Sequence, residues 1–231
     1  MARYALYYMP DPQSPLWHFG SQVLGYDAAS RSTVAFPTSP AFDLAQITAW
    51  TAEPRQYGFH ATLKPPFELA EGVEPEDLLA AAAMFASMRP PFRIAPLRLT
   101  AIGPFLALCP SAAARDIDSL AADCVCGFDR FRAPLSPQDR ERRLKSPLTP
   151  RQIAQLDAWG YPYVFDDFRF HMTLSGPLHE ADRAVFAQAL AELYAPVRQA
   201  DGLLVDAIAV FCQEARGERF FVVRRFPLTG G

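Results

Sequence analysis

Proline residues are spread along this chain at a density that limits the length of every regular element. The sequence of 231 residues contains 22 prolines and 12 glycines, and proline interrupts helices and removes a hydrogen-bond donor from strands. We therefore expect many short helices and strands. A hydrophobic content of 50% still supplies a substantial core, which excludes the disordered and fibrous classes.

The spacing of apolar residues between these breaks predicts strands and helices in small groups. Strands are predicted over residues 4–9, 57–69, 92–108, 161–178, 203–211 and 219–226. Helices are predicted over residues 16–24, 42–50, 76–88, 112–128, 137–144, 151–159 and 180–194. Because there is no repeated strand-helix-strand order and no Gly-rich phosphate loop, the pattern favours an α+β fold over a doubly wound sheet.

The charge balance restricts the partners of the chain. A net charge of −3 gives no chain-wide positive field for a long nucleic acid or an anionic membrane, so a bound phosphate has to be held locally. The arginines of 140–143 and of 224–225 are interpreted as solvated faces, and contact with an RNA end stays open. The N-terminus lacks signal-peptide features, and the longest nearly apolar run, 78–88, is too short to span a membrane. We expect a cytoplasmic protein without membrane contact, and the sequence does not predict its oligomeric state.

The cysteines and histidines do not form a recognisable metal framework. No spacing of zinc-ribbon, HExxH or HxH type occurs, and threonine is a poor ligand, which disfavours a metal-hydrolase site built from His60, His171, Asp166 and Asp167. We expect no metal and no cofactor. The four cysteines are predicted to be reduced and mostly buried: Cys109, Cys124, Cys126 and Cys212.

Two short strings, far apart in the chain, share the pattern Phe-His-apolar-Thr-Leu. Alternate side chains of a β-strand point the same way, so His60 and Thr62 are predicted to share one face, and so are His171 and Thr173. The apolar residues of each string then face a core. A single His-x-Thr string has little weight, but its repetition with the same flanking residues indicates a functional pair.

Two imidazoles on opposite sides of one phosphate group can divide the work of hydrolysis. The neutral imidazole takes a proton from the attacking oxygen, and the protonated imidazole gives one to the leaving oxygen. The threonine hydroxyls can donate hydrogen bonds to the phosphate oxygens on which charge builds. This chemistry needs no metal ion, and each proton transfer contributes about 100- to 10,000-fold in rate.

The paired strings resemble the signature of the 2H phosphoesterase superfamily. Within it, the chain is similar to a bacterial branch often encoded beside phosphonate-degradation genes, a similarity carried by residues 3–8, 57–67 and 159–174. The resemblance implies a bilobal α+β fold, in which two small antiparallel sheets face a central cleft and helices lie outside. It also implies that His60 and His171 are the acid and base, and that Thr62 and Thr173 bind the phosphate.

The same resemblance implies how the chain is divided. We expect one bilobal domain over residues 1–231, with lobes of roughly 1–110 and 160–231. The helical stretch 111–159 is then an insertion or a cover.

Residues beside the strings are further candidates for the site. Lys64 continues the face of the first string, and Arg169 shares the face of the second, so each cation can counter a phosphate charge. Arg55 and Tyr57 precede the first string and are candidates for the cleft mouth. His18 and His179 are predicted to be peripheral.

These observations predict a metal-independent phosphoesterase that hydrolyses a small cyclic or linear phosphodiester and is linked to phosphonate metabolism by the resemblance alone. The alternative is a non-catalytic protein that binds a nucleotide, a cyclic phosphate or an RNA end. Two proton-transfer groups favour the enzyme, because binding alone does not require them. Neither the substrate nor the assignment of acid and base follows from the sequence.

Overall fold

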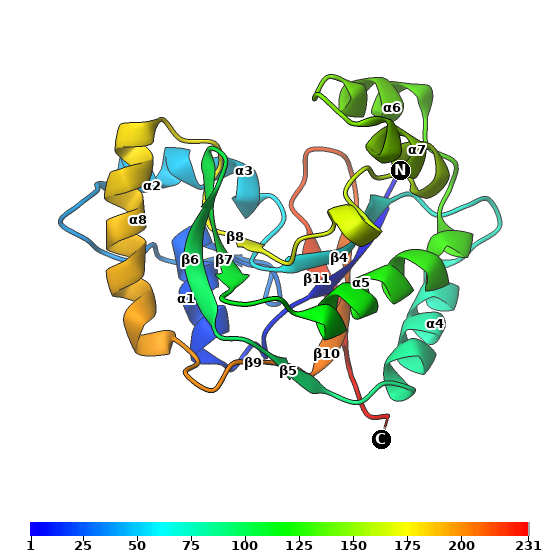
Figure 1. The fold of residues 1–231 in the computed structure, drawn as a ribbon, viewed down its shortest axis with the longest axis horizontal. Helices are drawn as coiled ribbons and strands as arrows, with labels where there is room; N and C mark the ends of the chain where they lie inside the picture. Colours follow the sequence, from blue (N-terminus) through cyan, green and yellow to red (C-terminus); the bar gives the residue numbers. More distant parts are fainter. Residues whose placement is uncertain (231) are drawn as a thin grey trace.

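A seven-stranded antiparallel sheet, with helices packed around it, forms the centre of the computed structural model, which describes residues 1–230 (Figure 1). The strand order is β11-β10-β1-β4-β8-β7-β6. In chain order these strands are Arg3–Tyr8 (β1), Ala61–Phe67 (β4), Leu97–Ile102 (β6), Phe105–Pro110 (β7), Met172–Thr173 (β8), Ala207–Gln213 (β10) and Phe221–Pro227 (β11). Two smaller antiparallel pairs join Tyr26–Asp27 (β2) to Ser32–Thr33 (β3), and Phe92–Ile94 (β5) to Leu203–Val205 (β9). The predicted α+β class with antiparallel sheets is confirmed.

The large sheet has two halves that meet at a single pair of residues. The halves are β11-β10-β1-β4 and β8-β7-β6, and Ala61 of β4 pairs with Met172 of β8 between them. Each half combines strands from before residue 110 with strands from after residue 160. The halves of the sheet therefore do not follow the sequence ranges that we assigned to the two lobes.

Helices cover the outside of both halves. They are Pro15–Leu24 (α1), Leu44–Trp50 (α2), Ala52–Arg55 (α3), Pro75–Ser87 (α4), Arg115–Gly127 (α5), Pro137–Leu144 (α6), Pro150–Trp159 (α7) and Glu180–Tyr194 (α8). Helix α4 packs against β10 and β11, α5 against β4, and α8 against β6 and β7. Helices α6 and α7 pack on each other and lie together at the upper right of Figure 1. No helix within residues 1–230 is long and apolar enough to cross a membrane.

Capping residues explain where several helices begin and end. The Ser14 side chain accepts a hydrogen bond from the backbone N–H of Trp17 at the start of α1, and Gly25 ends that helix with a left-handed φ of 67°. Thr149 forms a capping box with Gln152 and starts α7, as the Thr-Pro sequence predicts.

Residues 161–178 differ from their predicted structure. We expected a strand-rich segment, but it contains only the two residues of β8 and a 3-10 turn at Phe165–Asp167. Tyr161, Tyr163 and Phe165 line a cavity, so their alternation reflects cavity lining and not a sheet ladder. The prediction of free cysteines is confirmed, and two of the four are buried.

Candidate active site

The pairing at the junction of the sheet places the two His-x-Thr strings side by side. Ala61 and Met172 are the middle residues of the strings, and they are partners in an antiparallel register. That register sets His60 beside Thr173 and Thr62 beside His171, where directly opposed Cβ atoms lie about 4.5–5.5 Å apart. Each histidine thus lies opposite the threonine of the other string.

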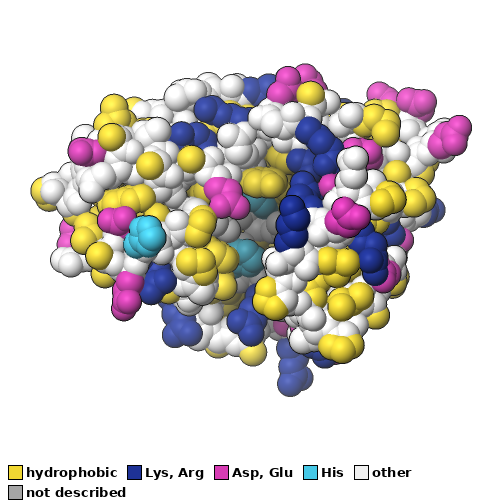
Figure 2. Space-filling view, turned by 90° about the horizontal axis from the view of Figure 1, so that it is seen from above, with side chains coloured by type: hydrophobic (Ala, Val, Ile, Leu, Met, Phe, Trp, Pro, Cys, Tyr) yellow, Lys and Arg dark blue, Asp and Glu magenta, His cyan; other side chains and the backbone are white. Residues whose placement is uncertain are grey.

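Two adjoining cavities open above this junction. The first, the His60 cavity, has a volume of about 650 Å³ and is lined by His60, Thr62 and Thr173. The second, the His171 cavity, has a volume of about 630 Å³ and is lined by Thr62 and His171. Because Thr62 borders both, together they form one cleft. Figure 2 shows a hollow in this face, with histidine side chains at its floor and basic side chains along one side.

Both imidazoles are oriented by the same backbone contact. His60 Nδ1 lies 2.9 Å from the carbonyl oxygen of Gly58, and His171 Nδ1 lies 2.7 Å from that of Arg169. A carbonyl oxygen only accepts, so each Nδ1 carries the proton and donates it. Nε2 of each neutral ring is therefore free of a proton, and the Thr62 hydroxyl donates to Nε2 of His60 at 3.3 Å.

Burial makes both imidazoles weak bases. It lowers the pKa of His60 to about 4, an effect opposed by the Gly58 carbonyl and reinforced by the nearby His171. Burial also lowers the pKa of His171, opposed by the Arg169 carbonyl. A phosphate anion between the rings favours the protonated form and counters this effect. The site is thus suited to hold one proton on either ring once an anion is bound.

Aromatic residues that we did not identify from the sequence shape the cleft. The ring of Tyr7 stacks on His60 with centroids 3.7 Å apart, and Tyr7 is the cross-strand partner of Thr62. Phe105, Tyr161 and Tyr163 line both cavities. The aromatic residues of the N-terminal strand were a signal from which Tyr7 could have been identified as a residue of the site. Phe105 is distant in sequence from both strings and carried no such signal.

Of the four further candidates, Lys64 is placed away from the cleft, and its predicted face is wrong. Tyr7 pairs with Thr62 but Leu6 pairs with Lys64, so an extra residue in β4 reverses the alternation between them. The Lys64 side chain is 1% exposed and donates to Asp129 Oδ1 at 3.0 Å. It supports the packing of α5 on β4.

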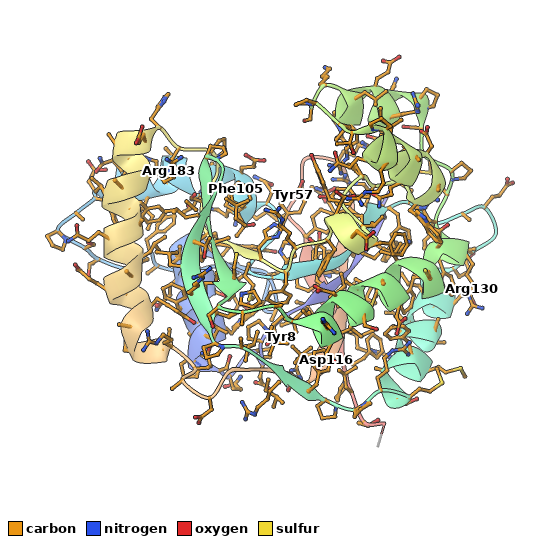
Figure 3. All side chains as sticks on the ribbon, in the orientation of Figure 1. Tyr8, Tyr57, Phe105, Asp116, Arg130 and Arg183 are labelled. Atoms are coloured by element: carbon orange, nitrogen blue, oxygen red, sulfur yellow. The ribbon has the colours of Figure 1, made fainter. Side chains whose placement is uncertain are left out.

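The remaining candidates lie in different environments. Arg55 donates to the Thr51 hydroxyl and to two backbone carbonyl oxygens, and it lines neither cavity. Arg169 is exposed and lines the His171 cavity. Tyr57 lines the His60 cavity, with its ring 6.2 Å from that of His60. Figure 3 shows Tyr57 beside Phe105, which comes from the other half of the sheet.

Within the described part of the chain, residues 1–230, no group of three His, Cys, Asp or Glu side chains is arranged to hold a metal ion. His18 and His179 are exposed and lie outside both cavities, as predicted.

The fold is similar to solved structures at low sequence identity. TT0787 of Thermus thermophilus is 18% identical with a TM-score of 0.48, and the similarity covers 99% of this chain and 98% of that one. The structure of E. coli LigT complexed with 3′-AMP is 15% identical with a TM-score of 0.44, covering 98% of both chains.

Two curated relatives share a higher sequence identity with this chain than these solved structures do, and both are longer than this chain. The chain is 37% identical over its full length to a protein of Janthinobacterium sp. (strain Marseille) named ribose 1,5-bisphosphate phosphokinase PhnN, of which it covers 51%. A protein of the same name from Laribacter hongkongensis (strain HLHK9) is 33% identical over 96% of this chain and 51% of its own length. The chain thus spans about half the length of these curated relatives. Residues 62–221, more than half of the chain, match the family described as "Protein of unknown function (DUF1045)". The chain belongs to the DUF1045 family.

Proposed function

We propose that this chain is a metal-independent phosphoesterase of the 2H type that hydrolyses a small cyclic or linear phosphodiester. The pairing of Ala61 with Met172 carries the proposal, because it sets two histidine-threonine pairs across one junction at the floor of the cleft. Acid-base hydrolysis requires two such imidazoles, one neutral at Nε2 to accept a proton and the other protonated there to donate one.

The reaction follows from this arrangement. Nε2 of one neutral histidine accepts a proton from water as the water oxygen bonds to phosphorus. The other histidine, protonated, donates its Nε2 proton to the leaving oxygen as the phosphorus–oxygen bond breaks. Gly58 and Arg169 hold the two Nδ1–H groups throughout, and Thr62 and Thr173 donate to the non-bridging oxygens. Proton exchange with solvent then restores the starting state.

The names of the relatives guide the proposed substrate class. They refer to a kinase of ribose 1,5-bisphosphate, and this chain contains no Gly-rich phosphate loop. We therefore assign the kinase activity to the remaining half of those proteins, and to this half a phosphodiester of a related sugar. The resemblance to a branch encoded beside phosphonate-degradation genes supports a role in phosphonate metabolism.

A panel of cyclic phosphates tests the proposal directly. Purified protein is incubated in EDTA with 2′,3′-cyclic nucleotides, ribose cyclic phosphates and ADP-ribose cyclic phosphate, and products are followed by phosphorus NMR. We expect at least one compound to open to a phosphomonoester at a rate that EDTA does not change. Binding without product throughout the panel would support the non-catalytic alternative. Activity that EDTA abolishes and a divalent ion restores would contradict the metal-free mechanism.

A further inference from the structure

Helix α6 presents one arginine to the cleft without an acidic partner. Arg140 and Arg142 are paired with aspartates at 2.6 and 2.8 Å, which agrees with a solvated face. Arg143 is half-buried, and no carboxylate of residues 1–230 lies within ion-pair distance of it. Its guanidinium lies over the ring of Tyr161, 4.8 Å from the centroid. The interpretation of this arginine run as solvated is therefore wrong for Arg143.

Arg143 lines the same cavity as the proposed reaction centre. The His60 cavity is bordered by Arg143 together with His60, Thr62 and Thr173. Its volume of about 650 Å³ is in the range of pockets that hold whole small-molecule ligands and exceeds the needs of a single cyclic phosphate group. A cation placed inside such a pocket is stabilised by an anion that enters with the substrate.

A second arginine, Arg3, lines a neighbouring pocket together with Arg143, Glu68 and Asp139, and it lines neither cavity of the cleft. Arg3 is half-buried and bonded to the neutral side chain of Gln213, again with no carboxylate partner within the described residues. Burial raises the pKa of the Tyr7 hydroxyl, and the charges of Arg3 and Arg143 both oppose that shift. Tyr7 itself lines the His60 cavity. Of these two arginines, only Arg143 also lines the His60 cavity.

We propose that Arg143 binds a second phosphate group of the substrate, so that the preferred substrate is a small cyclic phosphodiester of a sugar that also carries a phosphate monoester. The inference rests on the proposed function, because His60 and His171 hold the diester while Arg143 holds the other group. A guanidinium binds a phosphate monoester through two parallel hydrogen bonds, and the cation–π contact with Tyr161 restrains the Arg143 side chain. Hydrolysis of such a substrate gives a sugar with two phosphate monoesters, the class of compound for which the relatives are named.

The test uses matched substrates and matched variants. Ribose 1,2-cyclic phosphate and adenosine 2′,3′-cyclic phosphate are each assayed with and without a phosphate on O5. For at least one pair, wild-type kcat/KM is expected to be about 10- to 100-fold higher with the extra phosphate, the range of a hydrogen bond to a charged group. Arg143→Gln should remove this preference and leave kcat/KM for the unphosphorylated compound nearly unchanged.

Control variants separate this effect from folding and from general charge. Arg140→Gln removes the same charge from the same helix outside the cavities, and it should keep the preference. Thermal unfolding checks that both variants stay folded. Equal kcat/KM for both members of each pair, or a preference that survives Arg143→Gln, would overturn the second-phosphate site and leave the phosphoesterase standing. A preference that Arg169→Gln removes and Arg143→Gln keeps would overturn the assignment to Arg143. No turnover of any of the four compounds by wild-type protein, with none in the wider panel, would overturn the proposed function itself.

Discussion

Replacement of either His60 or His171 by alanine is expected to lower kcat by about 100- to 10,000-fold. Each change removes one of the two groups that move a proton in the proposed reaction. The neighbouring threonine cannot replace it, because a hydroxyl is a far weaker acid and base than an imidazole. Since the two histidines act as a unit, the double variant should lose little more activity than either single variant.

The folded state should tolerate both changes. Each histidine donates to the backbone carbonyl two residues before it, and His60 also accepts from Thr62 in its own string. These contacts are local, so the loss of either side chain leaves the sheet pairing in place. His179→Ala, an exposed residue outside the cavities, is the matched control and should keep full activity. Steady-state rates and circular dichroism measure the two effects separately. A His60 or His171 variant that is folded and keeps more than about a tenth of wild-type kcat would show that this residue is no proton-transfer group.

Asp129→Ala is expected to lower the free energy of unfolding by about 3–5 kcal/mol. The ammonium of Lys64 is almost completely buried, and Asp129 Oδ1 lies 3.0 Å from it. Without this carboxylate, Lys64 keeps only the carbonyl of Val125 as an acceptor and stays close to the cation of Arg132. Burial already lowers the pKa of Lys64, so the loss of its counter-ion leaves a charge that the interior does not stabilise.

Lys64→Met supplies the comparison for that prediction. It replaces the buried cation with an apolar chain of similar length, and Asp129 keeps its ion pair with Arg132 at 2.8 Å. The cost should therefore be clearly smaller than for Asp129→Ala, although the Val125 carbonyl loses a donor. Urea denaturation of the two variants gives both values. Equal losses of unfolding free energy in Asp129→Ala and Lys64→Met would show that the Lys64 side chain acts by packing and not as a buried charge.

The sequence predicted the parts of the fold that depend on local signals. Thr149 and Pro150 predicted the start of α7, and the apolar spacing predicted most other helices. The repeated strings identified the two histidines that the structure brings to one cleft. Their mutual pairing was not predicted, because register between distant strands depends on how the whole sheet assembles.

The errors have specific physical causes. The face of Lys64 was predicted from strict alternation, and one extra residue in β4 was enough to reverse it. We grouped Arg143 with the neighbouring arginines because the segment is rich in arginine. Its position on α6 nevertheless brings Arg143 to the His60 cavity. The approach of a helix to a cavity lined by residues distant in the chain has no periodic signal in the sequence.

The pH dependence of kcat/KM tests the two-histidine mechanism most directly, because this ratio reports ionisations of the free enzyme. The base has to be neutral, so the rate rises with pH through the pKa of the base. The acid has to be protonated, so the rate falls as pH passes the pKa of the acid. Burial lowers both pKa values below the usual 6.5, that of His60 to about 4. The apparent values belong to the coupled pair and not to one residue.

The mechanism therefore predicts a bell-shaped profile of kcat/KM with its maximum below pH 6.5. His60→Ala and His171→Ala should each remove one limb from whatever activity remains. A wild-type profile with a single limb between about pH 3 and 9 would contradict the mechanism, because it would show that only one group transfers a proton.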